Sequence, residues 1–202
     1  MLFAKNVVMD DRIRSIALGA DARRVLSIFV SKSLRRLGGS LNFDNLESIV
    51  VDPKNPLFDS REGCNALIET RKNRLIIASA KMAIPGSVEH LAFSWNNKLT
   101  SISIPKGVKT ISASMLYHAD SLKHIEIDPE NAVYETRGVQ AIITKEKGYC
   151  LFVVEGETLP EGVIVRRKPA PSEQPSYPSA ARYAANRKTK SKWTIVDGDL
   201  PF

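Results

Sequence analysis

The sequence contains few cysteines and no long apolar run, and each absence excludes a class of protein. Two cysteines among 202 residues exclude a scaffold held by several disulfides. No apolar run approaches the roughly 18 residues that a membrane-spanning helix needs. The first dozen residues also lack the apolar stretch of a secretory signal. We therefore expect a soluble, cytoplasmic protein with reduced thiols and no cofactor.

The positive charge of the chain is concentrated at its two ends. The composition is that of a globular protein, with 43% hydrophobic and 25% charged residues, and the net charge is +7. Residues 1–40 carry eight Lys and Arg against three acids, and residues 166–202 carry the same numbers. Residues 41–165 carry thirteen against sixteen, so the middle of the chain is mildly acidic.

The composition changes abruptly near residue 166. Arg166-Arg-Lys168 is followed by four of the eleven prolines, all between Pro169 and Pro178, and then by the basic run Arg187 to Lys192. Because this segment offers few apolar anchors, burial cannot offset the entropy lost on ordering it. We expect residues 166–192 to form a disordered, extended, basic linker.

A short apolar pattern recurs through the middle of the chain. Leu99-Thr-Ser-Ile-Ser-Ile104 reappears 23 residues later as Leu122-Lys-His-Ile-Glu-Ile127. Earlier copies are Leu46 to Val51 and Val25 to Val30. Ile13 to Leu18 has the same form and suggests a still earlier turn, although its register overlaps that of the next copy.

A longer unit is also duplicated. Asp52-Pro-Lys-Asn-Pro and Asp128-Pro-Glu-Asn-Ala each begin a block that ends in a Leu-Pro or Ile-Pro pair about thirty residues later. Inside the blocks, apolar runs lie in pairs, and we expect each pair to form an inserted β-hairpin. The pairs are 66–68 with 75–77 and 141–143 with 150–152.

These repeats predict a solenoid of short strands. The alternating apolar positions of each unit indicate a strand with one buried face. The following proline ends the strand, and glycine or serine allows the bend, as in Ile104-Pro-Lys-Gly-Val108. Since a single unit leaves its apolar row exposed, neighbouring units must stack to bury one continuous core.

The pattern resembles the BspA-type leucine-rich repeats, a bacterial group, over about residues 25–165. The resemblance rests on Ile104-Pro-x-Gly-Val108-x-x-Ile111, the 23-residue spacing, and the Asp-Pro-x-Asn blocks. It implies a mainly β, curved solenoid without intrinsic catalysis, in a family that commonly binds other proteins and is often surface-exposed. The chain departs from the family in lacking a visible signal peptide, and one turn is shortened to 20 residues. Residues 1–24 would then form an N-terminal cap, helical or strand-like.

The last residues, 193–202, carry a second resemblance. Asp199-Leu-Pro-Phe202 is similar to the C-terminal tip of bacterial single-stranded DNA-binding proteins, although Gly198 interrupts the acidic run and their DNA-binding domain has no counterpart here. The resemblance implies a docking peptide read by genome-maintenance proteins. A terminal ring and carboxylate suit a pocket with a basic rim. The expected partner-binding residues are Trp193, Asp197, Asp199, Leu200, Pro201 and Phe202.

Two other interpretations of this segment remain open. Ile195, Val196, Leu200 and Phe202 would also suit a closing strand or cap folded back on the solenoid, a less favoured interpretation than the docking peptide. The match to the tip can also be a coincidence.

Other polar residues have plain structural explanations. The three imidazoles, His90, His118 and His124, are too few and too far apart for a metal site, so we expect solvated or packing roles. We expect Cys64 and Cys150 to be buried free thiols. A cation site is one reading of the equivalent pairs Asp52 with Asn55 and Asp128 with Asn131, but turn chemistry explains them better.

The basic ends suggest a nucleic-acid contact as an alternative. Lys beside an aromatic ring suits single strands, and the candidates are Arg187, Lys188, Lys190 and Lys192 next to Trp193. Six arginines gather near the N-terminus: Arg12, Arg14, Arg23, Arg24, Arg35 and Arg36. No nucleophile elbow, phosphate loop or carboxylate pair is visible, so we expect no enzyme.

The sequence therefore favours a non-catalytic interaction protein, in which a leucine-rich solenoid presents the C-terminal peptide to a protein partner. The alternatives are a factor that binds single-stranded nucleic acid through its basic ends, and a surface adhesin-like repeat protein.

Overall fold

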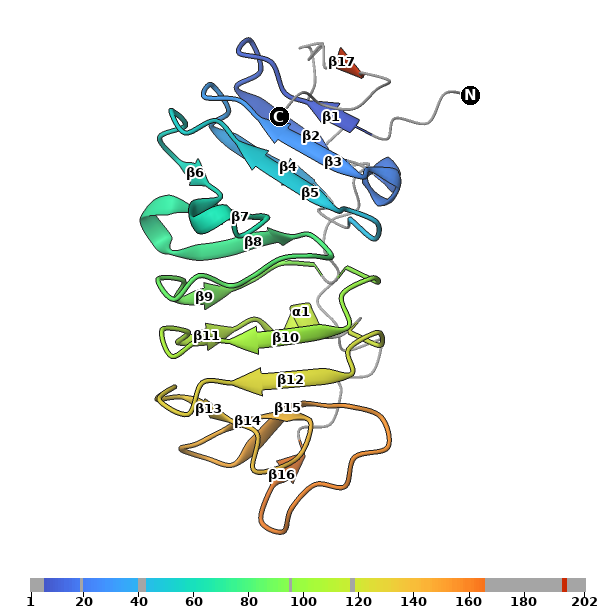
Figure 1. Ribbon diagram of the computed structural model, residues 1–202, viewed down its shortest axis with the longest axis vertical. Coiled ribbons are helices and arrows are strands. Elements are labelled where there is room, and N and C mark those ends of the chain that lie inside the picture. Colours follow the sequence, from blue (N-terminus) through green and yellow to red (C-terminus); the bar gives the residue numbers. More distant parts are fainter. Residues whose placement is uncertain are drawn as a thin grey trace.

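The computed structural model describes residues 6–18, 20–39, 43–94, 96–116, 119–165 and 194–195. Within these ranges the chain forms seventeen short strands, three 3-10 turns and one four-residue helix, so it is mainly β. Figure 1 shows the coils stacked along the long axis, from β1 to β3 at one end to β16 at the other. The predicted fold class, a solenoid of short strands with inserted hairpins, is confirmed.

Two parallel ladders run through the first coils. One ladder contains β1 (Asn6–Val8), β3 (Ser27–Val30) and β5 (Ser48–Val51), and the other contains β2 (Ser15–Leu18) and β4 (Arg36–Gly39). Asn6, Ser27 and Ser48 are in register, so each of these coils is 21 residues long. The 3-10 turn η1 (Ala20–Arg24) lies between β2 and β3.

The N-terminal segment belongs to this stack. The Ile13 to Leu18 pattern, which suggested a separate earlier turn, contributes β2, the second strand of the coil that begins with β1. It therefore does not precede the Val25 copy as an equivalent unit, since β2 pairs with β4 and not with β3. The Ile13 and Val25 patterns overlap in the repeat register because they form strands of two different ladders.

Both expected hairpins are present. The first contains β6 (Phe58–Asp59), β7 (Ala66–Glu69) and β8 (Arg74–Ala78), with η2 (Arg61–Gly63) and η3 (Thr70–Lys72) as connections. The second contains β13 (Tyr134–Glu135), β14 (Ala141–Thr144) and β15 (Tyr149–Val153). The strands within each hairpin are antiparallel, and the hairpins join the coils on either side.

The outer strand of each hairpin restarts a parallel ladder. β8 pairs in parallel with β9 (His90–Leu91), which pairs with β11 (Thr110–Ile111). β15 pairs in the same way with β16 (Ile164–Val165). On another face, β10 (Ser101–Ile104) pairs with β12 (His124–Ile127), and α1 (Ala113–Leu116) lies between them in sequence.

The core follows the alternation of the repeat. Ile102 and Ile104 on β10 are buried, whereas Ser101 and Ser103 between them are exposed. Corner turns return the chain after each strand: the Val108 N–H donates to the Pro105 carbonyl at 3.2 Å, and equivalent bonds recur around the stack. The predicted strands and proline bends therefore lie where the repeat places them. None of the helices in the described ranges is long and apolar enough to cross a membrane.

The corners of neighbouring coils touch at a glycine. A Cβ on Gly107 would lie 2.3 Å from the backbone oxygen of Gly86, whereas a Cβ on Gly86 would meet nothing within 4 Å. Because the obstructing atom is backbone, the coils must separate to admit even one methyl group.

We therefore expect Gly107→Ala to lower the free energy of unfolding by about 1–3 kcal/mol, the usual cost of overpacking. Gly86→Ala is the matched control and should change stability by less than about 0.5 kcal/mol. Urea unfolding followed by circular dichroism measures both. Equal midpoints for the two variants would contradict the close approach of the corners.

Candidate functional site

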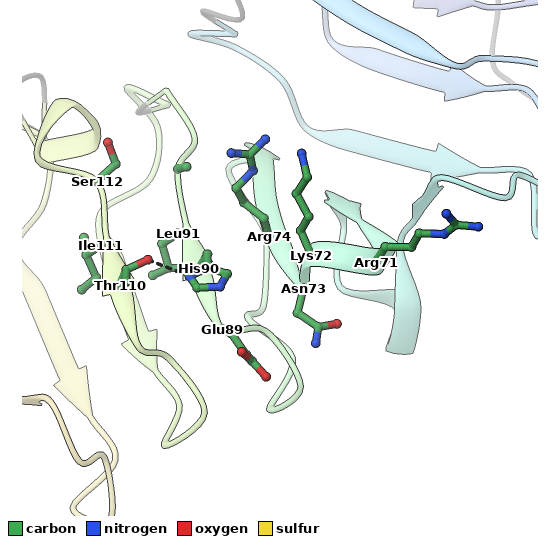
Figure 2. Close-up of a pocket in the computed structure, with 11 residues that line it drawn as sticks. Arg71, Lys72, Asn73, Arg74, Glu89, His90, Leu91, Thr110, Ile111 and Ser112 are labelled. Carbon is green, nitrogen blue, oxygen red and sulfur yellow. Dashed lines mark hydrogen bonds between the residues drawn. The ribbon is translucent and has the colours of Figure 1, made fainter.

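An open groove crosses the three parallel strands β8, β9 and β11. Its volume is about 700 Å³, and its walls come from the β7–β8 connection, the two short strands and the residues that follow them. Figure 2 shows these residues along the three strands and the connection before β8. The groove is therefore built where a hairpin strand adjoins two ordinary coils.

Register aligns a row of polar side chains along the groove. Arg74, His90 and Thr110 occupy the same register position on the three strands. The next positions, Leu75 and Leu91, are buried in the core. Since side chains alternate along a strand, the first row faces outward. The His90 Nδ1 atom lies 2.8 Å from the Thr110 hydroxyl (Figure 2), so this interaction joins β9 to β11 at the surface.

Positive charge exceeds negative charge around the groove. The Glu69 carboxylate accepts a hydrogen bond from Arg74 Nε at 2.6 Å and also lies 3.5 Å from the Lys72 ammonium, so one acid serves two cations. Glu89 pairs with Lys109 at 2.8 Å, and this hydrogen bond holds the pKa of Glu89 below its usual value. Two carboxylates thus face four cations, which are Arg71, Lys72, Arg74 and Lys109.

The cations gather on one side. In Figure 2, Lys72 and Arg74 project together along one edge of the groove, while Asn73 and Glu89 project the opposite way. We call Lys72 and Arg74 the basic rim. Arg74 is the register neighbour of His90 on the adjacent strand, so the rim borders the row that continues to Thr110.

Asn73, between the two rim residues, is held by a network of its own. Asn73 has a left-handed backbone with φ of 46°, which asparagine tolerates, and this turn sends the chain into β8. Arg61 donates to the Asn73 side-chain oxygen at 3.1 Å and pairs with Asp59 at 2.7 Å. Burial acts to raise the pKa of Asp59, but the hydrogen bonds led by Arg61 outweigh it, and the pKa is lowered.

The connection also holds the neighbouring coil in place. The Asn73 carbonyl accepts hydrogen bonds from the N–H groups of Glu89 at 2.9 Å and His90 at 3.2 Å. At the far side, the Tyr134 hydroxyl accepts from the Ile111 N–H at 3.1 Å, so a side chain continues the ladder beyond β11. Burial raises the pKa of this tyrosine. The groove therefore rests on a fixed frame.

The Asp-Pro-x-Asn blocks are structural, as turn chemistry predicted. The Asp52 and Asp128 carboxylates each accept a hydrogen bond from the N–H two residues later, at 2.8 and 2.9 Å. The Asn131 amide is fully buried; it donates to the carbonyls of the Pro105 corner and accepts from two N–H groups of its own block. Within the described ranges, no three His, Cys, Asp or Glu side chains lie close enough to hold a metal ion.

The two cysteines are buried free thiols. Cys64 donates to the Ala66 carbonyl at 3.7 Å, and Cys150 donates to the Phe152 carbonyl at 3.2 Å. Burial raises the pKa of both thiols. A raised pKa disfavours the reactive thiolate, so both residues act as small core side chains.

The expected C-terminal contacts lie almost wholly outside the described residues. This holds for Trp193, Asp197, Asp199 and Leu200 to Phe202, for the basic run Arg187 to Lys192, and for His118. The exception is β17 (Thr194–Ile195), which pairs antiparallel with β1 (Figure 1). Ile195 therefore lies in a strand that closes the N-terminal end of the ladder, as one of the alternative interpretations of the C-terminal segment predicted.

Two of the N-terminal arginines are paired with acids, and two others are neighbours. Arg12 pairs with Asp10 at 2.6 Å, and Arg23 lies 3.7 Å from Asp44. Arg14 and Arg36 are exposed neighbours, since the Arg36 N–H donates to the Arg14 carbonyl at 3.1 Å. The basic rim instead lies beside the groove, where η3 leads into β8, between the runs 66–68 and 75–77 that predicted the first hairpin.

Comparison with known proteins gives little guidance. No protein-family model matches the chain, and no curated protein matches it. One solved structure is similar, a leucine-rich repeat protein from Eubacterium ventriosum, at 20% identity and a TM-score of 0.34. The similarity covers 51% of this chain and 36% of that chain, and it identifies neither a function nor a partner.

Proposed function

We propose that this protein is a non-catalytic interaction scaffold of the BspA-type leucine-rich repeat class, and that its groove binds an acidic segment of a partner protein. The observation that carries the proposal is the outward row of Arg74, His90 and Thr110 beside the basic rim. The row is polar and lies across a rigid sheet, and the charge around it is positive.

The chemistry of the rim suits carboxylates. A guanidinium offers a planar fork of donors to a carboxylate, and an ammonium adds a mobile charge. Glu69 is shared between Arg74 and Lys72, so these two cations have one carboxylate between them. A carboxylate of the partner would give the second cation an acid of its own. Since these groups lie at the surface, binding should be steered by charge and weakened by salt.

A labelled pentaglutamate peptide is the probe for this site. We expect the double variant Lys72→Glu with Arg74→Glu to bind it at least about tenfold more weakly than the original chain, because two attractions become repulsions. The matched control is Lys54→Glu with Lys123→Glu, two exposed lysines elsewhere that change the net charge equally. Fluorescence anisotropy at several salt concentrations measures the affinities.

If both double variants weaken binding equally, the peptide senses net charge and the groove is not the site. A labelled single-stranded oligonucleotide should bind more weakly than the peptide. Tighter binding of the oligonucleotide, lost in Arg14→Glu with Arg36→Glu, would favour the nucleic-acid alternative instead.

We also propose that the chain presents its C-terminal Asp-Leu-Pro-Phe tip to a second protein, in the manner of single-stranded DNA-binding proteins. The support is the sequence: Phe202 supplies an aromatic ring, and Pro201 lowers the entropy lost on docking. The partner would be a genome-maintenance protein with a basic-rimmed pocket. The cytoplasmic location stays a prediction, as does the surface-adhesin alternative.

Removing Phe202 alone should abolish capture of helicases, exonucleases and recombination mediators from a bacterial lysate, as identified by mass spectrometry. Thr189→Ala, in the same C-terminal region, is the control and should retain capture. Unchanged capture without Phe202 would show that the tip is not the anchor.

A further inference from the structure

The N-terminal end of the solenoid is a strand edge that the chain covers with its own C-terminal segment. The strands of the first ladder are ordered β17, β1, β3, β5. β1 therefore pairs with β3 on one side and with β17 on the other, and Figure 1 shows β17 beside β1 at that end. Every other pairing in this ladder is parallel, whereas β17 runs antiparallel.

The alternation of the backbone identifies which N–H and carbonyl groups of β1 face β17. The Met9 N–H donates to the Phe29 carbonyl of β3 at 3.0 Å. Successive N–H groups of a strand point to opposite sides, so the Val8 N–H and carbonyl face away from β3. Val8 is in register with Thr194, which makes these two the hydrogen-bonded pair of the β1–β17 contact.

We propose that the outer edge of β1 is a binding site for an extended peptide strand, and that its resident ligand is the segment of this chain around Thr194–Ile195. An uncovered edge of this kind templates pairing with any extended segment, which is the basis of recognition by strand addition. The inference is independent of the groove and of the tip, since it uses neither.

The surface beside the edge suits such a ligand. Val8, Phe29 and Val50 are in register across β1, β3 and β5 and lie half-buried in one outward row. Apolar side chains next to an open backbone edge give an added strand both hydrogen bonds and contact surface. Other strands of the same fold carry polar outward rows, such as Ser101 and Ser103 on β10.

The intervening chain is long enough to make the connection. Residues 166–193 lie between β16 and β17, and 28 residues reach about 90 Å when extended. Even if all seventeen strands stacked in one line at about 4.8 Å, the stack would be shorter than this. The segment around β17 can therefore return from one end of the solenoid to the other within one molecule.

Hydrogen exchange at single amides, followed by NMR on the full chain, tests the site. In the original chain the Val8 amide should be protected. Thr194→Pro removes the N–H that would donate to the Val8 carbonyl and disfavours the strand, so we expect the Val8 amide to exchange at least about tenfold faster. The Met9 amide, bonded to β3, should change little. Lys190→Pro is the control outside β17 and should leave Val8 protected.

A synthetic peptide of residues 190–198, which ends before the tip, supplies the ligand in trans. Added to the Thr194→Pro chain, it should restore protection of the Val8 amide in a concentration-dependent way. Equal Val8 exchange in the original and Thr194→Pro chains would overturn the proposal. Failure of the peptide to restore protection at millimolar concentration would also overturn it, because the edge would then not bind a free strand. Neither outcome depends on Phe202 capture or pentaglutamate binding.

Discussion

The fold depends on buried side-chain amides that tie one coil to the coil before it. Asn131 has no exposed surface, and its amide joins two carbonyls of the preceding corner to two N–H groups of its own block. Asn55 makes the same four bonds in the first block, to the corner at Ser31 and Leu34. Stacked coils bury little surface individually, so bonds between corners fix which residues of neighbouring coils meet.

Two further amides extend this principle to the hairpins. The Asn65 side chain accepts from the Ile49 N–H at 2.8 Å and donates to the Glu47 carbonyl at 2.8 Å, so it replaces one rung of the ladder beyond β5. In the second hairpin, Gln140 accepts from the Ile125 N–H at 2.6 Å just before β14. Each hairpin is thereby attached in a fixed register. Because β8 belongs to the first hairpin, this register also sets the row of Arg74, His90 and Thr110 that lines the groove.

The sequence predicted those parts of the molecule that local pattern determines. Alternating apolar residues located β3, β5, β10 and β12, and the duplicated blocks located both hairpins. The sequence did not predict which distant strands pair with each other. The basic rim was not recognised as a site because its alignment with His90 depends on the hairpin register. The role of Asn65 was missed as well, since a lone asparagine before an apolar run signals a turn and not a rung between coils. For the basic rim, the one signal in the sequence was the basic run Arg71-Lys-Asn-Arg74 itself.

The most direct measurement is the stability of Asn131→Ala against Asn97→Ala, an exposed asparagine at another corner. Truncating the buried amide leaves two carbonyls and two N–H groups without partners inside the fold, and each such group carries a desolvation cost. Urea unfolding should show a loss of about 2–5 kcal/mol for Asn131→Ala and less than about 0.5 kcal/mol for Asn97→Ala. If the two variants unfold at the same urea concentration, buried amides do not hold the coils in register.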